Sequence, residues 1–324
     1  MRTRDWIALM AALAAAAVIS LGVGPVAMSA GELWQALWGK GDSQFVAIIQ
    51  TIRLPRVALG MAVGAGLSVS GVALQATLRN PLAEPYLLGV SGGAAVGAVL
   101  GTALGWMQPG AIAMAAFGGA AAAVMLVLAV AHAAGASSSS PVLVMAGVVV
   151  GAFANAAILV VLAGAPDGAV RDALWWMMGS LSGATWTAAA WLSLFVVLGG
   201  AMLWARAREI DVLSLGGDAA AALGVDVDRA TRTVFLISAV LAAATVSAAG
   251  LIGFVGLLVP AIVRALGARS SRSTFLAAAI GGAALVVAAD VVARTVRAPA
   301  ELPLGAVTAL VGVPFFLARM RRSS

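Results

Sequence analysis

Two arginines three residues apart, Arg53 and Arg56 in the segment IRLPR, directly precede a long apolar run. A guanidinium is permanently charged and can donate two parallel hydrogen bonds to a carboxylate. Charge at this position could bind an acidic partner, or it could anchor the end of a helix among lipid headgroups. A third arginine, Arg294, follows Asp290 by four residues, and this spacing predicts a local ion pair on one helix face.

The sequence lacks the residue groups that bond-breaking chemistry requires. No G-x-x-x-x-G-K-[ST] phosphate-binding loop occurs, and Lys40, the single lysine, lies in WGKGD without the required spacing. Cysteine is absent, which excludes thiolate metal sites and a cysteine nucleophile, and the single histidine, His132, cannot build a metal site by itself. We therefore expect no enzymatic activity, no catalytic residue, and no cofactor or metal bound by this chain.

A few uncharged polar residues interrupt the apolar segments. Gln75 and Asn155 are amides, which in a membrane bond across helices or line a cavity. Asn155 is therefore a candidate for lining a substrate path, with interhelical hydrogen bonding as the alternative. The serine run ASSSSPVLV, which contains Ser139 and Ser140, has the composition of a flexible connector.

These residues must be positioned by a membrane-embedded helical bundle. Of the 324 residues, 62% are apolar and 10% are charged, which leaves too little polar surface to cover a soluble domain of this size. The net charge of +6 comes from arginines dispersed between apolar runs, so it does not indicate a nucleic-acid partner. We expect an all-α, polytopic membrane protein that contacts lipid and forms one transmembrane domain over residues 1–324.

Long apolar stretches predict ten transmembrane helices. The first is interpreted as a retained span because its apolar run is longer than that of a usual signal peptide, although Ala27-Met28-Ser29 resembles a cleavage site. The pair on either side of GLIGF is the weakest, because its turn is short and Pro260 interrupts the second helix. The predicted ranges are 6–23, 56–77, 87–105, 111–131, 142–163, 185–205, 230–248, 251–267, 274–294 and 303–319.

The basic residues predict how these spans are oriented. Both ends of the sequence are basic, which places both termini in the cytoplasm and requires an even number of spans. With ten spans, most of the basic residues lie on the cytoplasmic side, and IRLPR faces outward against that trend. The exceptions to the rule are Lys40, Arg53, Arg56, Arg171, Arg294 and Arg297.

Glycines recur every four residues along the predicted third span, at Gly89, Gly93, Gly97, Gly101 and Gly105. Such a stripe lets helix backbones approach closely in lipid, so it predicts helix packing and no chemistry.

The longest cytoplasmic connection predicts a short surface helix. In its segment 211–226, Asp218 is expected to cap AAAALG and Gly224 to end it. A solvated loop is one interpretation, and a surface on which a separate motor domain acts is the other.

Five segments of the chain together resemble the FecCD-type permeases of bacterial ABC importers for iron-siderophore, haem and cobalamin. They are RLPRVALGMAVGAGLSVSGVALQATLRNPLAEPYLLGVSGGAAVGA, WWMMGSLSGATW, LSLGGDAAAALGV, GLIGFVGLLVPAIVR and ELPLGAVTALVGVPFF. The resemblance implies the type II ABC importer permease fold in the bacterial inner membrane. It also implies a homodimer, two ATPase subunits that use ATP and magnesium, and a periplasmic or lipid-anchored substrate-binding protein.

The resemblance further implies roles for particular residues. The segment from Leu215 to Gly224 is similar to the coupling helices that seat in the ATPase, with Gly216, Asp218 and Leu223 inside it. Ser139 and Ser140 correspond to the cytoplasmic gate, although Pro141 departs from the family pattern. Docking of the binding protein is implied for Arg53, Arg56 and Arg294, whereas Arg297 receives no role.

The mechanism implied by the resemblance is alternating access along a mostly apolar path at the homodimer interface. Substrate selectivity then lies with the binding protein, so the permease sequence says little about which chelate is carried. We expect an iron-siderophore, with haem and cobalamin as alternatives. The alternative class is a secondary transporter that works without ATP.

Overall fold

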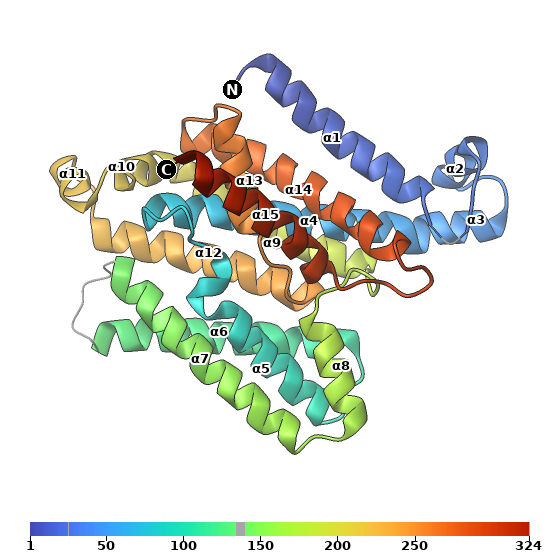
Figure 1. The fold of residues 1–324 in the computed structure, drawn as a ribbon, viewed down its shortest axis with the longest axis horizontal. Helices are drawn as coiled ribbons and strands as arrows, with labels where there is room; N and C mark the ends of the chain where they lie inside the picture. Colours follow the sequence, from blue (N-terminus) through green and yellow to red (C-terminus); the bar gives the residue numbers. More distant parts are fainter. Residues whose placement is uncertain (25, 134–139, 324) are drawn as a thin grey trace.

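The structure is a computed structural model that describes residues 1–24, 26–133 and 140–323. Over these residues the chain forms helices joined by turns and contains no strand (Figure 1). This confirms the all-α fold that the composition predicts.

Each of the ten predicted ranges overlaps a helix in the described part of the chain. Seven helical segments are long and apolar enough to cross a membrane, and three apolar stretches are shorter. The long segments contain α1 (Thr3–Gly22), α4 (Leu54–Thr77), α6 (Pro109–Ala133), α7 (Ser140–Ala163), α9 (Trp186–Ala205), α12 (Val227–Ala249) and α14 (Ser271–Thr295). The shorter stretches are α5 (Val90–Ala103), α13 (Val255–Ala265) and Leu304–Leu317 of α15 (Leu304–Ser323).

Several short helices were not predicted, because a window of span length averages over them. They are α2 (Ala30–Leu37), α3 (Ser43–Ala47), the 3-10 helix η2 (Pro85–Leu88), α8 (Asp167–Met177) and α10 (Ala207–Leu213). α2 begins at a capping box, in which Ser29 and Glu32 each accept a hydrogen bond from the other residue's backbone N–H.

The helix that contains IRLPR also begins earlier than predicted. Asp42 caps α3 by accepting a hydrogen bond from the Gln44 N–H at 2.7 Å, and the chain stays helical through the π-helix η1 (Ile48–Arg53) into α4. Arg53 and Arg56 therefore lie within one continuous helical segment, 43–77, and not at its start.

α4 is the central helix of the bundle. In its apolar 18-residue window 89% of the residues are buried, and the helix packs against α9, α12, α13 and α14. Glycines permit two backbone-to-backbone contacts: a Cβ atom on Gly64 would overlap the carbonyl of Gly282 in α14, and one on Gly71 would overlap that of Gly256 in α13. The core therefore depends on the absence of side chains at these positions.

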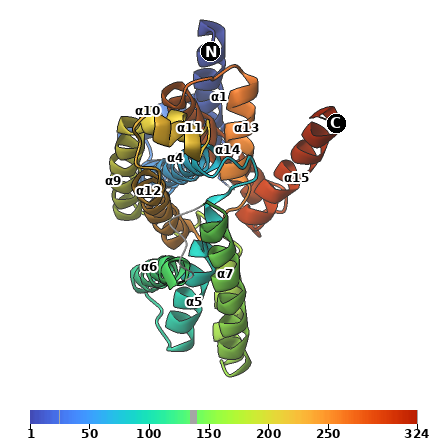
Figure 2. The same ribbon diagram turned by 90° about the vertical axis from the view of Figure 1, so that its left-hand side faces the viewer.

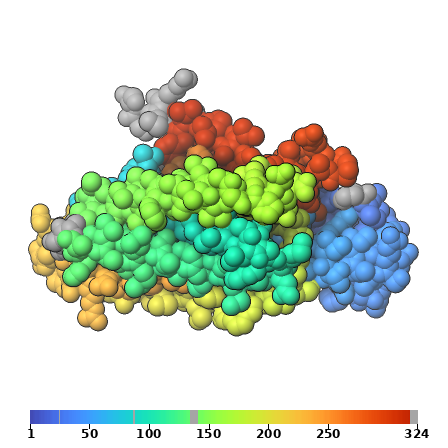
Figure 3. All heavy atoms as spheres, turned by 90° about the horizontal axis from the view of Figure 1, so that it is seen from below, coloured from blue at the N-terminus to red at the C-terminus, as the bar shows by residue number. Residues whose placement is uncertain are grey.

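A second group of helices, α5 to α8, packs beside this core (Figures 1 and 2) and makes up much of the face seen in Figure 3. α5 lies against α6 through its glycines, because Cβ atoms on Gly93 and Gly97 would overlap the backbone of Gly119 and Ala115. Gly89 and Gly105, at the ends of the stripe, have positive φ angles of 75° and 80° and form turns. The stripe thus packs α5 on α6, as its spacing indicates.

Both termini lie at one end of the bundle (Figure 1). The Met1 amino group donates a hydrogen bond to the carbonyl oxygen of Gly267 at 3.2 Å, in the turn between α13 and α14. We call this end, with α10 and α11 (Gly217–Ala222), the terminal end. The other end, with α2, α3 and residues 296–303, is called the opposite end.

Candidate functional site

At the terminal end, the predicted coupling segment projects from the bundle as two short helices, α10 and α11 (Figures 1 and 2). Leu215 and Leu223 are 66% and 64% exposed, whereas Ala220, between them in α11, is fully buried against Leu213 and Ala230. A small apolar core therefore supports α11 from below and leaves two leucines on its surface.

Glycine shapes the turns on both sides of α11. Gly216 has a φ of 119° and Gly224 a φ of 81°, which non-glycine residues rarely adopt. The expectation that Asp218 caps α11 was wrong: Gly216 is the N-cap, its carbonyl accepts from the Ala220 N–H at 2.9 Å, and Asp218 lies in the first turn. The turn at Gly216 starts the helix earlier than a cap at Asp218 would allow. A carboxylate in the first turn still complements the helix dipole.

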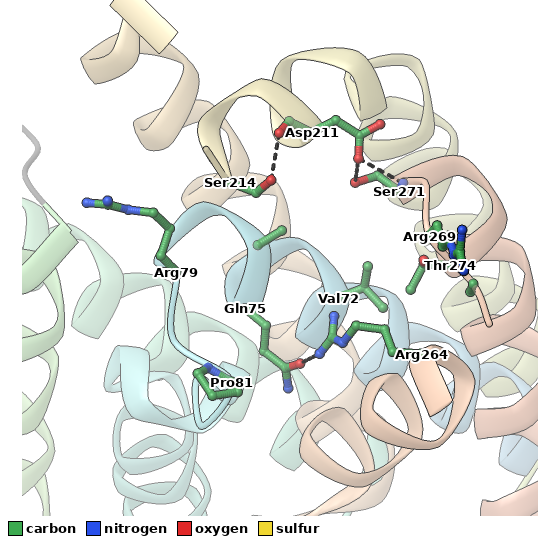
Figure 4. A pocket seen from close by; sticks show the side chains of 12 residues that line it. Val72, Gln75, Arg79, Pro81, Asp211, Ser214, Arg264, Arg269, Ser271 and Thr274 are labelled. Atoms are coloured by element: carbon green, nitrogen blue, oxygen red, sulfur yellow. Dashed lines mark hydrogen bonds between the residues drawn. The ribbon is translucent and has the colours of Figure 1, made fainter. Parts of the chain in front are cut away.

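Hydrogen bonds join the coupling segment to the transmembrane helices. The Asp211 carboxylate in α10 accepts from the Ser271 N–H at 2.9 Å and from the Ser271 hydroxyl at 2.6 Å, at the start of α14 (Figure 4). On the other side, a guanidinium nitrogen of Arg79, just beyond α4, lies 3.3 Å from where a Cβ atom of Gly216 would stand. The start of α14 and the turn that follows α4 therefore lie beside the coupling segment.

A pocket of about 280 Å³ lies behind this segment (Figure 4). Gln75 of α4 is buried in its wall, where its amide donates to the Gly256 carbonyl at 3.1 Å and accepts from Arg264. Both partners belong to α13, so Gln75 forms hydrogen bonds between helices. This is one of the two roles expected for an amide in an apolar segment.

The other polar candidates stand apart from this segment. Asn155 lies on the exposed face of α7, among apolar side chains such as Phe153 and Leu159, while Ala154 and Ile158 face the neighbouring helices. Ser139 lies outside the described residues, and Ser140 is the first residue of α7.

At the opposite end, Arg56 forms a buried double ion pair. Its guanidinium donates to Asp290 of α14 at 2.8–3.1 Å, and to both carboxylate oxygens of Glu301 at 2.7 and 2.8 Å. Arg56 is 8% exposed and Asp290 is 2% exposed. Hydrogen bonds from Arg56 hold the pKa of Glu301 below its usual value, so this carboxylate is ionised at neutral pH.

Arg53 and Arg294 bind the end of α1. Arg53 donates to the carbonyl oxygens of Leu21, Gly22 and Val26, and Arg294 donates to the carbonyl and the hydroxyl of Ser20. The last carbonyls of a helix have no partner within the helix, and these guanidinium groups supply one. The predicted pair of Asp290 with Arg294 is present at 3.6 Å, but it is longer than the contact of Asp290 with Arg56.

The structure therefore brings Arg53, Arg56 and Arg294 together, but it buries them at 4%, 8% and 8% exposure. Their guanidinium groups are paired inside the protein and not exposed, because α1, α14 and residues 296–303 provide acceptors that a linear sequence does not place beside them. Their docking role stays a prediction. Basic side chains that are exposed near this end belong to Lys40, Arg171 and Arg297.

Because Asp290 is buried, its replacement should lower the free energy of unfolding. Asp290→Asn keeps the shape of the side chain but leaves Arg56 and Arg294 with less opposing charge in a buried site, so we expect a loss of about 3 kcal/mol or more. Glu209→Gln is the matched control, because it breaks the exposed pair of Arg206 and Glu209, worth at most about 1 kcal/mol. Thermal unfolding of the purified proteins in detergent would compare the two. Equal destabilisation would contradict the buried ion pair.

Comparisons with known proteins agree with this architecture. Residues 12–322 match the FecCD transport family. The chain is 44% identical to the cobalamin import system permease BtuC of Halobacterium salinarum, over 85% of this chain and 73% of that protein. It is 35% identical to the hemin transport permease HmuU of Yersinia pestis, over 95% and 92% of the two chains.

A solved structure has the same fold along the whole chain. It is described as an inward-facing conformation of a metal-chelate type ABC transporter, with a TM-score of 0.89 and 28% identity over 99% of this chain and 100% of that one. This match confirms the fold that the sequence motifs imply. On these grounds the chain belongs to the FecCD transport family and is the permease of an ABC importer.

Proposed function

We propose that two copies of this permease, two separate ATPase subunits and a substrate-binding protein together carry a metal chelate across the cytoplasmic membrane by alternating access. The observation that carries the proposal is the coupling segment, an apolar contact surface on a chain that has no phosphate-binding loop of its own. ATP and magnesium are then used by the partner. Membership of an importer family that couples to ATP argues against the ATP-independent transporter.

The coupling segment is suited to transmit movement of a bound partner to the transmembrane helices. Leu215 and Leu223 offer apolar area to a cleft. Asp211 joins the segment to α14 by hydrogen bonds, and Arg79, which follows α4, lies beside Gly216. A movement of the segment would therefore reach two central helices without passing through a flexible linker.

A second copy is supported by the exposed face of α7. An amide that faces hydrocarbon has no partner there, so the face that carries Asn155 is better suited to a protein interface or a polar path. Isologous pairing of two such faces places Asn155 of both copies near a shared axis. This assigns Asn155 to the path of the dimer.

The charge at the terminal end supports a cytoplasmic location for both termini. Arginine gathers at that end of the spans, as the positive-inside rule requires. These residues include Arg79, Arg206, Arg208, Arg229, Arg232, Arg264, Arg269 and Arg272. The gate role of Ser139 and Ser140 would then lie on the same side as the ATPase subunits.

The opposite end would meet the binding protein. We keep Arg53, Arg56 and Arg294 as the docking residues that the family resemblance implies, with the condition that their internal partners rearrange. The exposed Arg297 is a competing candidate, since its charge needs no rearrangement.

For the substrate, an iron-siderophore is the first proposal. Cobalamin is the second candidate, favoured by the 44% identity to a cobalamin permease, and haem is the third, from the similarity to a hemin permease. All three are metal chelates, so the shared chemistry of the path does not separate them.

The coupling proposal is tested by replacing the exposed leucines. Burying two leucine surfaces that are about two-thirds exposed contributes about 1–2 kcal/mol each, so the double variant Leu215→Glu/Leu223→Glu should bind the ATPase at least tenfold more weakly. Co-purification of the ATPase subunits measures this. Leu266→Glu, at the same end but outside the segment, is the control, and equal loss in both proteins would remove the coupling role.

The docking proposal is tested by salt. Raising salt from about 0.1 to 1 M shortens the Debye length from about 10 to 3 Å, so association of the binding protein with the complex in nanodiscs should slow by about tenfold. The salt dependence should persist in Arg297→Ala and weaken in Arg53→Ala. Two results would contradict docking by the buried arginines. One is an association rate that does not change with salt, and the other is a loss of the salt dependence in Arg297→Ala.

The substrate is decided by uptake. A strain that lacks this permease should lose accumulation of a radiolabelled iron-siderophore and regain it when the gene is restored. Radiolabelled cyanocobalamin and haem are measured in parallel, and loss of either one with unchanged iron-siderophore uptake would replace the first proposal by that candidate.

A further inference from the structure

The connection between α12 and α13 leaves the helical conformation inside the bundle. Residues 250–254, GLIGF, follow Ala249 and precede Val255, and two of them have positive φ angles: Gly250 with a φ of 71°, and Phe254 with a φ of 67° in the left-handed region. Left-handed backbone is uncommon for a bulky aromatic residue, and it persists only where its surroundings enforce it.

Two side chains from a distant part of the sequence bind the backbone of this segment. The Glu84 carboxylate accepts from the Phe254 N–H at 2.6 Å. The Tyr86 hydroxyl accepts from the Ile252 N–H at 2.7 Å and donates to the Ile252 carbonyl at 3.0 Å. These bonds replace the helical hydrogen bonds that the segment gives up, since backbone polar groups inside a membrane protein must be paired within the protein.

Both residues belong to the connection between α4 and α5: Glu84 is the N-cap of η2, and Tyr86 lies within it. Burial raises the pKa of Glu84, and the N–H of Phe254 opposes part of that effect. Burial also raises the pKa of Tyr86, so its hydroxyl stays protonated and can donate to Ile252 while accepting from it. The segment 250–254 is thus held by one carboxylate and one hydroxyl that have no other hydrogen-bond partner among the described residues.

α15 rests on this segment. A Cβ atom on Gly305 would stand against the Leu251 carbonyl oxygen, and one on Gly312 would lie 2.7 Å from the Cβ atom of Phe254. Between these contacts Leu310 is 76% exposed, and the C-terminal part of α15 diverges from the bundle (Figure 2). The N–H groups of Leu304 and Gly305 also donate to the carbonyls of Gly179 and Met178, so the position of α15 depends in part on where residues 251 and 254 lie.

We propose that Glu84 and Tyr86 are positioning residues that hold residues 250–254 and thereby set the orientation of α15 relative to the bundle. The Glu84 oxygen fixes Phe254 in its left-handed conformation, and the ring of Phe254 then supports α15 at Gly312. When the acceptor is lost, the segment opens more often and α15 separates from its neighbours. Transport that depends on a fixed α15 would fail while the coupling segment stays intact, and this reasoning does not depend on which chelate is carried.

Thiol labelling tests the proposal, because the chain contains no cysteine. Val307→Cys places a thiol on the buried face of α15, where Val307 is 7% exposed, and Ala278→Cys places a reference thiol in α14, where Ala278 is fully buried. The rate of modification by N-ethylmaleimide is measured for each thiol in the assembled complex in nanodiscs.

Glu84→Ala should raise the labelling rate at Val307→Cys by about tenfold, as expected when a buried hydrogen bond no longer opposes local opening. Glu84→Gln, which keeps an oxygen acceptor, should label as slowly as the Val307→Cys protein in which Glu84 is retained. Tyr86→Phe removes only the hydroxyl and should give an intermediate labelling rate. It provides a second test of the proposal if Glu84→Ala does not assemble. Asp172→Ala, an exposed carboxylate in α8, is the control for the loss of charge.

Three results would overturn the proposal. The first is an unchanged labelling rate in both Glu84→Ala and Tyr86→Phe. The second is an equal increase at Ala278→Cys, which would mean general loosening of the bundle. The third is acceleration by Glu84→Gln as large as that by Glu84→Ala, because the charge and not the acceptor would then hold the segment.

Discussion

The backbone contact between α4 and α14 at Gly64 and Gly282 is the interaction on which both functional ends depend. Two helices whose backbones are in contact have little freedom to slide past each other, because neighbouring side chains of each helix pack tightly against the other helix. The same pairing that joins the glycines sets Arg56 beside Asp290 at the opposite end. Toward the terminal end, α4 carries Gln75 to Arg264 and places Arg79 over Gly216.

One consequence is that a single buried helix connects the two surfaces that partners are proposed to use. An importer must relate events on one side of the membrane to events on the other, and a rigid element with contacts at both ends can do so. The cluster around Arg56 and the turn at Gly216 are the places where α4 meets segments that are less deeply buried. Movement is more readily accommodated there than along the glycine contacts.

Polar side chains supply hydrogen bonds at the places where helices end or break inside the bundle. Arg53 and Arg294 bind carbonyls at the end of α1, and Glu84 and Tyr86 bind the segment between α12 and α13. In each case the partner is distant in sequence. Because lipid offers no hydrogen bonds, such residues are needed for the fold even where they resemble functional groups. This explains why buried charge alone is a poor guide to a binding site in this chain.

The helical class, the approximate positions of the apolar helices, the glycine packing of α5 and the family could all be predicted from the sequence. Hydropathy, small-residue spacing and family motifs are local properties of the chain. The sequence also pointed to the surface helix in residues 211–226, although it mistook Asp218 for the cap that Gly216 provides. The partners of Arg53, Arg56 and Arg294, and the residues that hold the break before Phe254, became apparent only in the folded structure. Most of these contacts join residues more than 150 positions apart, such as Arg56 with Asp290 and Glu84 with Phe254, and Arg53 reaches carbonyls of another helix end. Local pattern carries no information about such pairs, because they are set by how the helices pack and not by what stands next to each residue.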